Sequence, residues 1–295
     1  MTCATQGRMR SVPQGASPTL LSRLAGSALF HRAIKVFKVQ QLAHSVLSRR
    51  PIVRRAGTIR YRLQYLESFL LADEIFQRGI YDAAFEGLDV STFIDLGCNV
   101  GYFVCCVGSK AKGDLTGLAV DGDASMTTET RWHVDINRLA VTVDHGAAGF
   151  PEDVKDVTFF VNPSNVASSA QPNLNPNVPS KGESRPVTVP AVHVYKRWTE
   201  LAGDRRVNLL KIDVEGTECD LLRVEQRLLG ITDRIVIEWH KWTTTLAQVE
   251  ELLASAGFTL RTIISDDEHA GVAVFDSKHL AEQVSKPHQP SITAV

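Results

Sequence analysis

Acidic residues are missing from the first 66 positions of this 295-residue chain, where 12 lysines and arginines precede the first acid, Glu67. All 33 acidic residues therefore lie after position 66, together with the remaining 32 - 12 = 20 basic residues. The net charge of -1 conceals a basic arm joined to an acidic body. Because the body is acidic and shows no interleaving of aromatic and basic residues, no nucleic-acid partner is expected.

Long apolar runs and metal-type cysteine spacings are also missing. No run approaches the roughly 18 apolar residues that a membrane span requires, and the N-terminus lacks the continuous apolar stretch of a secretory signal. The five cysteines form an odd set without the spacing of a metal site. These absences predict a protein of the reduced, cytoplasmic environment.

The basic arm is assigned to residues 1–58. Residues 1–18 are rich in Ser, Gly, Pro and Thr and are predicted to be disordered. Between 20 and 47, apolar residues recur at helical spacing among basic ones, which predicts one or two amphipathic helices. Such helices either pack on the body or contact an anionic membrane surface, and an organellar transit peptide has the same composition.

The body, residues 59–276, alternates between strand and helix patterns. This alternation is typical of an α/β fold with a mainly parallel sheet, and the last two strands are expected to form an antiparallel hairpin. The predicted strands are 92–96, 115–121, 140–144, 157–161, 207–213, 234–239, 258–264 and 271–275. The predicted helices are 63–78, 101–111, 124–138, 217–229 and 245–256.

Two segments of the chain depart from this alternation. Residues 162–186 are dense in Asn, Pro and Ser, and a polar loop of this length is either a lid over a binding site or disordered. Residues 277–295 are predicted to be a flexible tail.

The stretch FIDLGCNVGYF, residues 93–103, predicts a strand, a glycine turn and a helix. Its glycines, Gly97 and Gly101, are spaced G-x-x-x-G, which lacks the pyrophosphate-binding glycine of NAD and FAD proteins. Asp95 can pair with a ligand ammonium, and Asp121, at the end of the next strand, can accept hydrogen bonds from a ribose. This combination favours S-adenosylmethionine.

The expected cofactor site comprises these two motifs and their neighbours: Asp95, Gly97, Cys98, Asn99, Gly101, Tyr102, Phe103, Asp121, Gly122 and Asp123. Two alternatives remain open from the residues alone. The glycines can form a turn that serves packing only, and Asn99 can cap the helix that follows.

A second motif, VNLLKIDVEGTECDLL at 207–222, carries a buried strand to Asp213 and Glu215. With FIDLGCNVGYF and VIEWH at 236–240, it resembles the FkbM family of methyltransferases over about residues 60–275. The resemblance implies the Rossmann-like class I methyltransferase fold, with a seven-stranded sheet whose last strand is antiparallel. It also implies S-adenosylmethionine as cofactor and transfer to a hydroxyl of a small molecule or saccharide. The family's Glu-Pro-Asn is replaced here by Asp121-Gly122-Asp123, so ribose contact can pass to Asp123.

Methyl transfer to a hydroxyl requires a base or a metal that makes the hydroxyl more acidic. The candidate catalytic residues are Asp213, Glu215 and His240. Each has a structural alternative: Asp213 can cap a helix, Glu215 can anchor a turn, and His240 can be a buried structural histidine.

Several alternatives to this reading stay open. Asp213, Glu238 and His240 can together hold Mg²⁺ or Mn²⁺, although no metal is expected. Transfer to nitrogen or carbon, or a scaffold that binds the cofactor without turnover, also remains possible.

Overall fold

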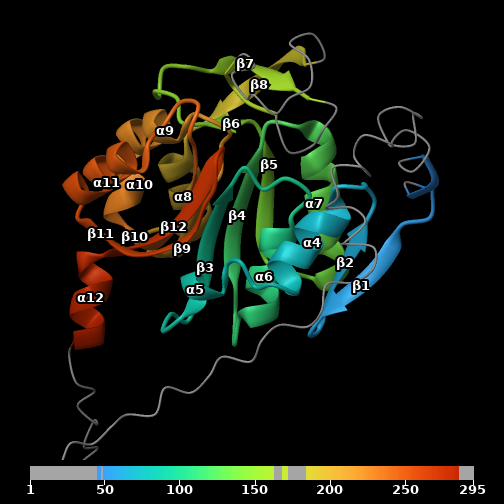
Figure 1. Ribbon diagram of the computed structural model, residues 1–295, viewed down its shortest axis with the longest axis horizontal. Helices are drawn as coiled ribbons and strands as arrows, with labels where there is room; N and C mark the ends of the chain where they lie inside the picture. Colours follow the sequence, from blue (N-terminus) through green and yellow to red (C-terminus); the bar gives the residue numbers. More distant parts are fainter. Residues whose placement is uncertain (1–44, 48, 163–167, 172–183, 286–295) are drawn as a thin grey trace, which may run out of the picture.

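The computed structural model describes residues 45–47, 49–162, 168–171 and 184–285 (Figure 1). A seven-stranded sheet with the order β11-β12-β10-β9-β3-β4-β5 forms its centre. Strands β5, β4, β3, β9 and β10 are parallel, and β12 runs antiparallel between β10 and β11. The predicted Rossmann-like α/β fold with an antiparallel last strand is therefore confirmed. The strand bounds are β3 Thr92–Leu96, β4 Thr116–Asp121, β5 Val141–His145, β9 Val207–Ile212, β10 Thr232–His240, β11 Phe258–Asp266 and β12 Ala270–Ser277.

The middle strands are buried along almost their whole length. All residues of β3 are buried, as are all but one residue of each of β9 and β10. Parallel strands with both faces covered need such continuous apolar runs. By contrast, β11 lies at the edge of the sheet, and most of its residues are exposed or half-buried.

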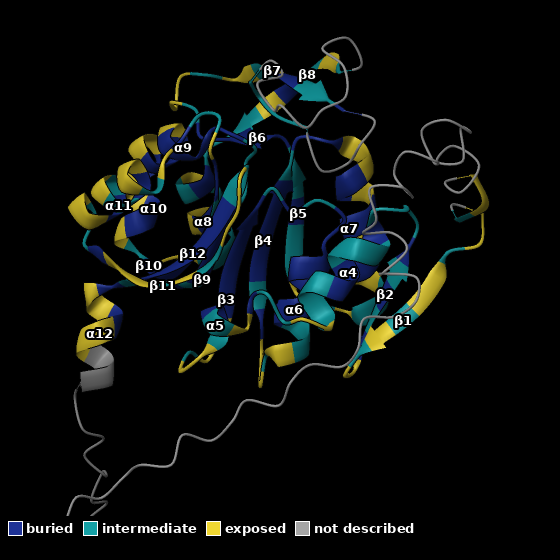
Figure 2. Ribbon diagram, viewed as in Figure 1, coloured by how far each residue is buried: buried dark blue, intermediate teal, exposed yellow. Residues whose placement is uncertain are grey.

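Helices cover both faces of the sheet (Figures 1 and 2). On one face, Trp198, Leu222 and Leu253 pack against the strands in a single hydrophobic cluster. On the other face, Phe103 and Val134 belong to a second cluster. The helix bounds are α8 Val194–Ala202, α9 Glu218–Val224, α10 Gln226–Gly230 and α11 Leu246–Ser255 for the first face, and α5 Asp82–Phe85, α6 Tyr102–Lys110 and α7 Ala124–Asn137 for the second. In the described part of the chain, none of the helices is long and apolar enough to span a bilayer.

The predicted helix 217–229 is in fact two helices, α9 and α10, separated at Glu225. The carboxylate of Glu225 accepts hydrogen bonds from the backbone N–H groups of Val194 and Tyr195, at the start of α8. This carboxylate satisfies two of the N–H groups that a helix start leaves without intrahelical partners. The prediction of a single helix was therefore wrong. The chain breaks at Glu225, whose side chain bonds to the start of α8.

A hairpin precedes the main sheet, formed by β1 Ile52–Ala56 and β2 Ile59–Leu63, and α4 Ser68–Phe76 follows it. The sequence placed residues 1–58 in a partly disordered and partly helical arm, with its helices between 20 and 47, and it predicted neither strand of this hairpin. The helix predicted from 63 begins at Ser68 instead. Apolar residues alternate in β2, where Tyr61 and Leu63 are buried, and this period of two is typical of a strand. The rest of the predicted arm, residues 1–44, lies outside the described residues.

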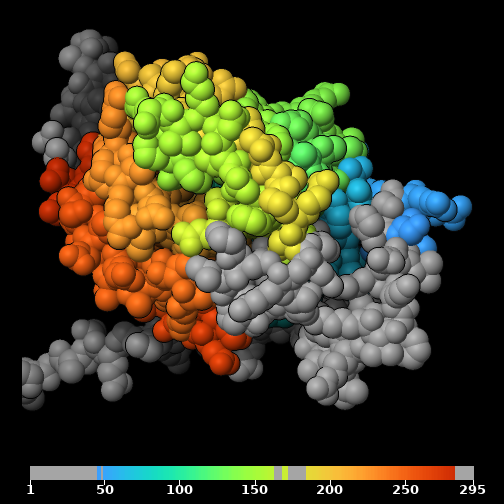
Figure 3. All heavy atoms as spheres, turned by 90° about the horizontal axis from the view of Figure 1, so that it is seen from above, coloured from blue at the N-terminus to red at the C-terminus, as the bar shows by residue number. Residues whose placement is uncertain are grey.

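A second, small sheet consists of β6 Ala147–Ala148, β8 Arg185–Val192 and β7 Asp156–Val161. The sequence assigned 157–161 to the main sheet and left 185–186 in the polar segment, and both assignments are wrong. Pro186 and Pro190 lie in β8, where they disguise a strand because proline cannot donate to a ladder. Seen from above, this region covers the middle of the molecule (Figure 3). Most of 162–186 lies outside the described residues.

The predicted flexible tail is also partly structured. Residues Lys278–Ser285 form helix α12, and Leu280 of this helix is buried. Residues 286–295 lie outside the described residues.

Candidate active site

The register of the parallel strands brings both sequence motifs to one edge of the sheet. Leu96 of β3 pairs with Val120 of β4 and with Ile212 of β9. The residues that follow or end these strands, Gly97, Asp121 and Asp213, therefore lie side by side.

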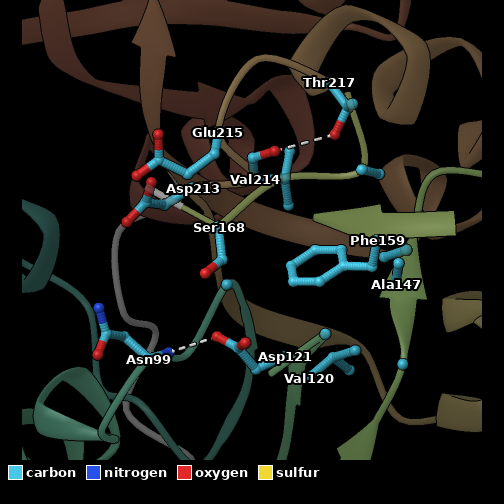
Figure 4. Close-up of a pocket in the computed structure, with 15 residues that line it drawn as sticks. Asn99, Val120, Asp121, Ala147, Phe159, Ser168, Asp213, Val214, Glu215 and Thr217 are labelled. Carbon is cyan, nitrogen blue, oxygen red and sulfur yellow. Dashed lines mark hydrogen bonds between the residues drawn. The ribbon is translucent and has the colours of Figure 1, made fainter. Parts of the chain in front are cut away.

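A pocket of about 590 Å³, partly open to solvent, lies at this edge (Figure 4). The figure shows the Asp213 and Glu215 carboxylates on one side and Phe159 on the other, with Asp121 below them. The pocket is lined by Gly97, Asn99, Val120, Asp121, Gly122, Gly146, Ala147, Ala148, Phe159, Ser168, Ala170, Asp213, Val214, Glu215 and Thr217.

The glycine turn serves packing and the pocket at once. Gly97 has a φ of 76°, and a Cβ there would lie 1.7 Å from the backbone oxygen of Asp213. Gly101 has a φ of 84° and packs against Thr130. Only Gly97 of the two lines the pocket. The bare Cα of Gly97 thus lets the end of β9 approach the turn.

Replacing Gly97 by alanine is expected to lower the free energy of unfolding by at least about 3 kcal/mol, because both the positive φ and the overlap with Asp213 oppose a side chain. Gly87→Ala is the matched control, since Gly87 has a φ of 69° but no atom within 4 Å of the added Cβ. That variant should lose only about 1 kcal/mol. Urea unfolding of both variants measures the difference, and equal losses would contradict the proposed role of the close approach.

Asp121 lies at the floor of the pocket with both carboxylate oxygens engaged. Its Oδ2 accepts a hydrogen bond from the backbone N–H of Asn99 and its Oδ1 accepts one from that of Asp123, both at 2.8 Å. Burial raises the pKa of Asp121 to about 7, although the two N–H groups oppose this shift. Each oxygen keeps a further lone pair, so Asp121 can still accept hydrogen bonds from a ligand.

Two further predicted cofactor residues lie in the pocket. Asn99 has a φ of 47°, and its side-chain oxygen accepts a hydrogen bond from the backbone N–H of Val100. The N-cap of α6 is Gly101, so Asn99 is not the helix cap. Gly122 lines the pocket beside Phe159, whose ring leaves no space for a Cβ at position 122.

Other predicted cofactor residues lie outside the pocket lining. Tyr102 is buried, and its hydroxyl donates a hydrogen bond to the backbone oxygen of Arg62. Phe103 is buried against Tyr81, and Cys98 is buried as well. These three side chains therefore support the turn from the core instead of facing a ligand.

The two remaining acids of the predicted cofactor set are also committed elsewhere. Asp123 caps α7 by accepting hydrogen bonds from the N–H and hydroxyl of Ser125. Asp95 is fully buried behind the turn, 3.3 Å from the ammonium of Lys211, and neither of its oxygens has a hydrogen-bond partner. A direct contact between Asp123 and a ribose therefore has no support in the geometry.

The candidate catalytic residues form one cluster. Lys211 binds Asp213 at 3.2 Å, and helix α9 begins only at Glu218, so Asp213 does not cap that helix. Glu215 has a φ of 50° and its carboxylate lies 3.4 Å from Nε2 of His240. Residues other than glycine whose backbone is held at a positive φ cluster at functional sites.

His240 is buried and does not line the pocket. Its Nδ1 lies 2.7 Å from Oε1 of Glu218. Burial lowers the pKa of His240, but the hydrogen bond with Glu218 and the negative charge of Glu215 outweigh burial and raise that pKa to about 10. An imidazole that is already protonated cannot take a proton from an acceptor, which opposes the predicted role of His240 as a general base.

The sequence reasoning missed Glu218 and the small sheet. Glu218 lies in the quoted VEGTE string, and its spacing of three from Glu215 was the available signal. Phe159 and Ala147 line the pocket from β7 and β6, and nothing in their local pattern separates them from strands of the main sheet.

Comparisons with known proteins show similarity to methyltransferases. Residues 131–260 match the methyltransferase FkbM domain. Methyltransferase 1 of Beauveria bassiana is 27% identical over 208 residues, which cover 66% of this chain and 82% of that protein.

Solved structures also resemble this chain at low identity. A SAM dependent methyltransferase from Aquifex aeolicus is 11% identical with a TM-score of 0.39, over 66% of this chain and 88% of that one. The ribosomal protein L11 methylase from Lactobacillus delbrueckii subsp. bulgaricus is 14% identical with a TM-score of 0.37, over 68% and 75%. The fold rests on the strand order described above. The domain match and the curated relative support a methyltransferase with an FkbM-type domain.

Proposed function

We propose that this methyltransferase uses S-adenosylmethionine and transfers the methyl group to a hydroxyl oxygen of a small molecule or saccharide. The observation that carries the proposal is the convergence of Gly97, Asp121 and Asp213 at one pocket, which follows from the strand register. Open parallel sheets bind their ligands at this edge, beyond the carboxyl ends of the strands.

The pocket suits the parts of this cofactor. Asp121 keeps lone pairs for the two ribose hydroxyls. Val120, Ala147 and Phe159 offer an apolar wall for the adenine ring. The backbone of Gly97 and Asn99 lines the pocket where the amino-acid end would lie, and Asp95, which the sequence assigned to the ammonium, lies behind that turn against Lys211.

The chemistry assigned to the acceptor side follows from Asp213 and Glu215, the carboxylates that line the pocket together with Asp121. When bound, the cofactor supplies a methyl group on a positively charged sulfur. Asp213 would accept the proton of the acceptor hydroxyl, so that the oxygen could take the methyl group that the bound cofactor would supply. The remaining task of the pocket is alignment of the two reactants and exclusion of water.

Calorimetric titration of the full chain tests the cofactor assignment. Titration with S-adenosylmethionine is expected to give saturable binding, and titration with NAD is expected to give none, because the turn lacks the pyrophosphate glycine. Absence of binding for both would favour a scaffold that keeps the fold without turnover. A screen of hydroxylated acceptors, with amines as the comparison set, then decides between oxygen and nitrogen transfer.

A further inference from the structure

His240 presents one nitrogen to a group of carboxylates and is held in place through the other. Its Nδ1 lies 2.7 Å from Glu218, and its Nε2 lies 3.4 Å from Glu215 and 3.9 Å from Glu238. Histidines that bind metals ordinarily donate their second N–H to a carboxylate or carbonyl, which fixes the ring. Glu218 is placed to do this here, so that Nε2 faces the other acids, and a cation bound at Nε2 would replace the proton that this nitrogen carries in the free protein.

The spacing of the neighbouring oxygens matches a coordination sphere. Asp213, Glu238 and His240 each offer one ligand atom, and these atoms all lie within 4.8 Å of one another. Metal–ligand bonds of about 2.0–2.6 Å allow two ligands of one ion to lie up to about 5 Å apart. The pairing of Ile212 with Ile237 explains this proximity, because it places the next residues, Asp213 and Glu238, side by side.

The same cluster gathers more carboxyl groups than basic groups. Ion pairs join five carboxylates to two cations: Asp95 and Asp213 to Lys211, and Glu215, Glu218 and Glu238 to His240. The second oxygen of Glu218 is buried and has no hydrogen-bond partner among the residues that the structure describes. Buried charges are costly unless they are paired, so a further cation would stabilise the cluster.

We propose that Asp213, Glu238 and His240 bind a divalent cation, with Mn²⁺ as the best match for a mixed set of carboxylate oxygen and imidazole nitrogen. No metal is expected from the sequence. The contact between Glu218 and Nδ1 of His240 changes this expectation, because it leaves Nε2 facing the other acids. Asp213 also lines the pocket, and its side chain is 25% exposed, so an ion held there is open to a further ligand from the acceptor side.

The role of the ion in turnover rests on the proposed function. An acceptor hydroxyl bound to the ion would lose its proton more readily. Because Asp213 would then be a ligand of the ion, Glu215, which also lines the pocket, would take over from Asp213 as the acceptor of that proton. An acceptor with two oxygens on neighbouring carbons would suit this site best, because both oxygens can bind the same ion.

The test uses the full chain, treated with EDTA and dialysed, and follows the electron paramagnetic resonance signal of free Mn²⁺ during titration. The wild type is expected to bind one ion per chain. Glu238→Gln should lose this binding, and Glu218→Gln should weaken it about 10- to 100-fold, because the ring is no longer held by a carboxylate. Glu251→Gln, on an exposed position of α11, is the matched control and should bind as the wild type does.

Far-UV circular dichroism shows whether each variant is folded, and Asp213→Asn replaces Glu238→Gln if the latter does not fold. Wild-type protein that binds no Mn²⁺, or a folded Glu238→Gln or Asp213→Asn that binds it unchanged, would overturn the proposal. Titration with S-adenosylmethionine on the EDTA-treated protein separates the two ideas. Cofactor binding without Mn²⁺ binding would overturn the metal site and leave the proposed function intact. Mn²⁺ binding without cofactor binding would support the metal site and contradict the proposed cofactor.

Discussion

Asp213→Asn is expected to reduce turnover by about 10²- to 10⁴-fold, the range that a general base contributes. Affinity for S-adenosylmethionine should change little, because the proposed ribose and adenine contacts come from Asp121 and Phe159 instead. Asparagine keeps the shape of the side chain and can still accept a hydrogen bond from Lys211, which lies 3.2 Å from Oδ2. The variant loses only the carboxylate, which can take a proton and whose negative charge can bind a cation.

The measurement is formation of S-adenosylhomocysteine with the acceptor that the screen identifies, next to calorimetric cofactor affinity. Asp220→Asn is the control, since Asp220 lies on α9 with its side chain 57% exposed, paired with Arg223. A turnover that falls less than threefold in folded Asp213→Asn would remove Asp213 from the catalytic residues. An equal loss in Asp220→Asn would point to a general disturbance of α9.

Asp121→Ala is expected to weaken the binding of S-adenosylmethionine by at least about 100-fold. The variant loses hydrogen bonds to a charged group, each of which contributes about 1.5–3 kcal/mol. It also leaves the N–H groups of Asn99 and Asp123 without their acceptor, so the turn is less well fixed. Asp123→Ala is the control because Asp123 caps α7 outside the pocket lining, and it should cost about 1 kcal/mol of stability with nearly unchanged affinity.

The pH dependence of cofactor affinity gives a second measurement on Asp121. Its pKa of about 7 means that the carboxyl group of the free protein is largely protonated below that pH. A protonated carboxyl accepts ribose hydrogen bonds less well, so affinity should fall as pH decreases below 7, by at most about tenfold per pH unit. Asp121→Asn, which cannot titrate, should show no such slope. A wild-type affinity that is constant between pH 5 and 8 would contradict the assignment.

The fold and the placement of the cofactor turn could be predicted from sequence because both depend on local patterns. Buried runs such as TFIDL, residues 92–96, can only be inner strands of a covered sheet, and the order of motifs then places Asp121 and Asp213 at one edge. Within the turn, however, the sequence could not separate residues that face the ligand from those that face the core. Tyr102 and Phe103 follow Gly101 directly, yet they point into hydrophobic clusters.

The environment of His240 could not be predicted, since it depends on contacts over long sequence distances. Glu218 lies 22 positions away and reaches the imidazole only because β10 and α9 pack together. A histidine at the end of a strand is a plausible general base when its imidazole is neutral. The carboxylates around His240, which the sequence does not reveal, keep this imidazole protonated. The small sheet was missed for a similar reason, because two prolines conceal β8 until β7 is seen beside it.

The small sheet shares no hydrogen-bonded ladder with the seven-stranded sheet in the described ranges. Its strands occupy the stretch of chain between β5 and α8, while Asp121 and Asp213 belong to other elements. One wall of the pocket, which includes Phe159, therefore comes from a stretch of chain outside the central sheet. Exchange of this stretch between homologues would change the wall proposed for the adenine ring while the glycine turn and the sheet beneath it are left as they are.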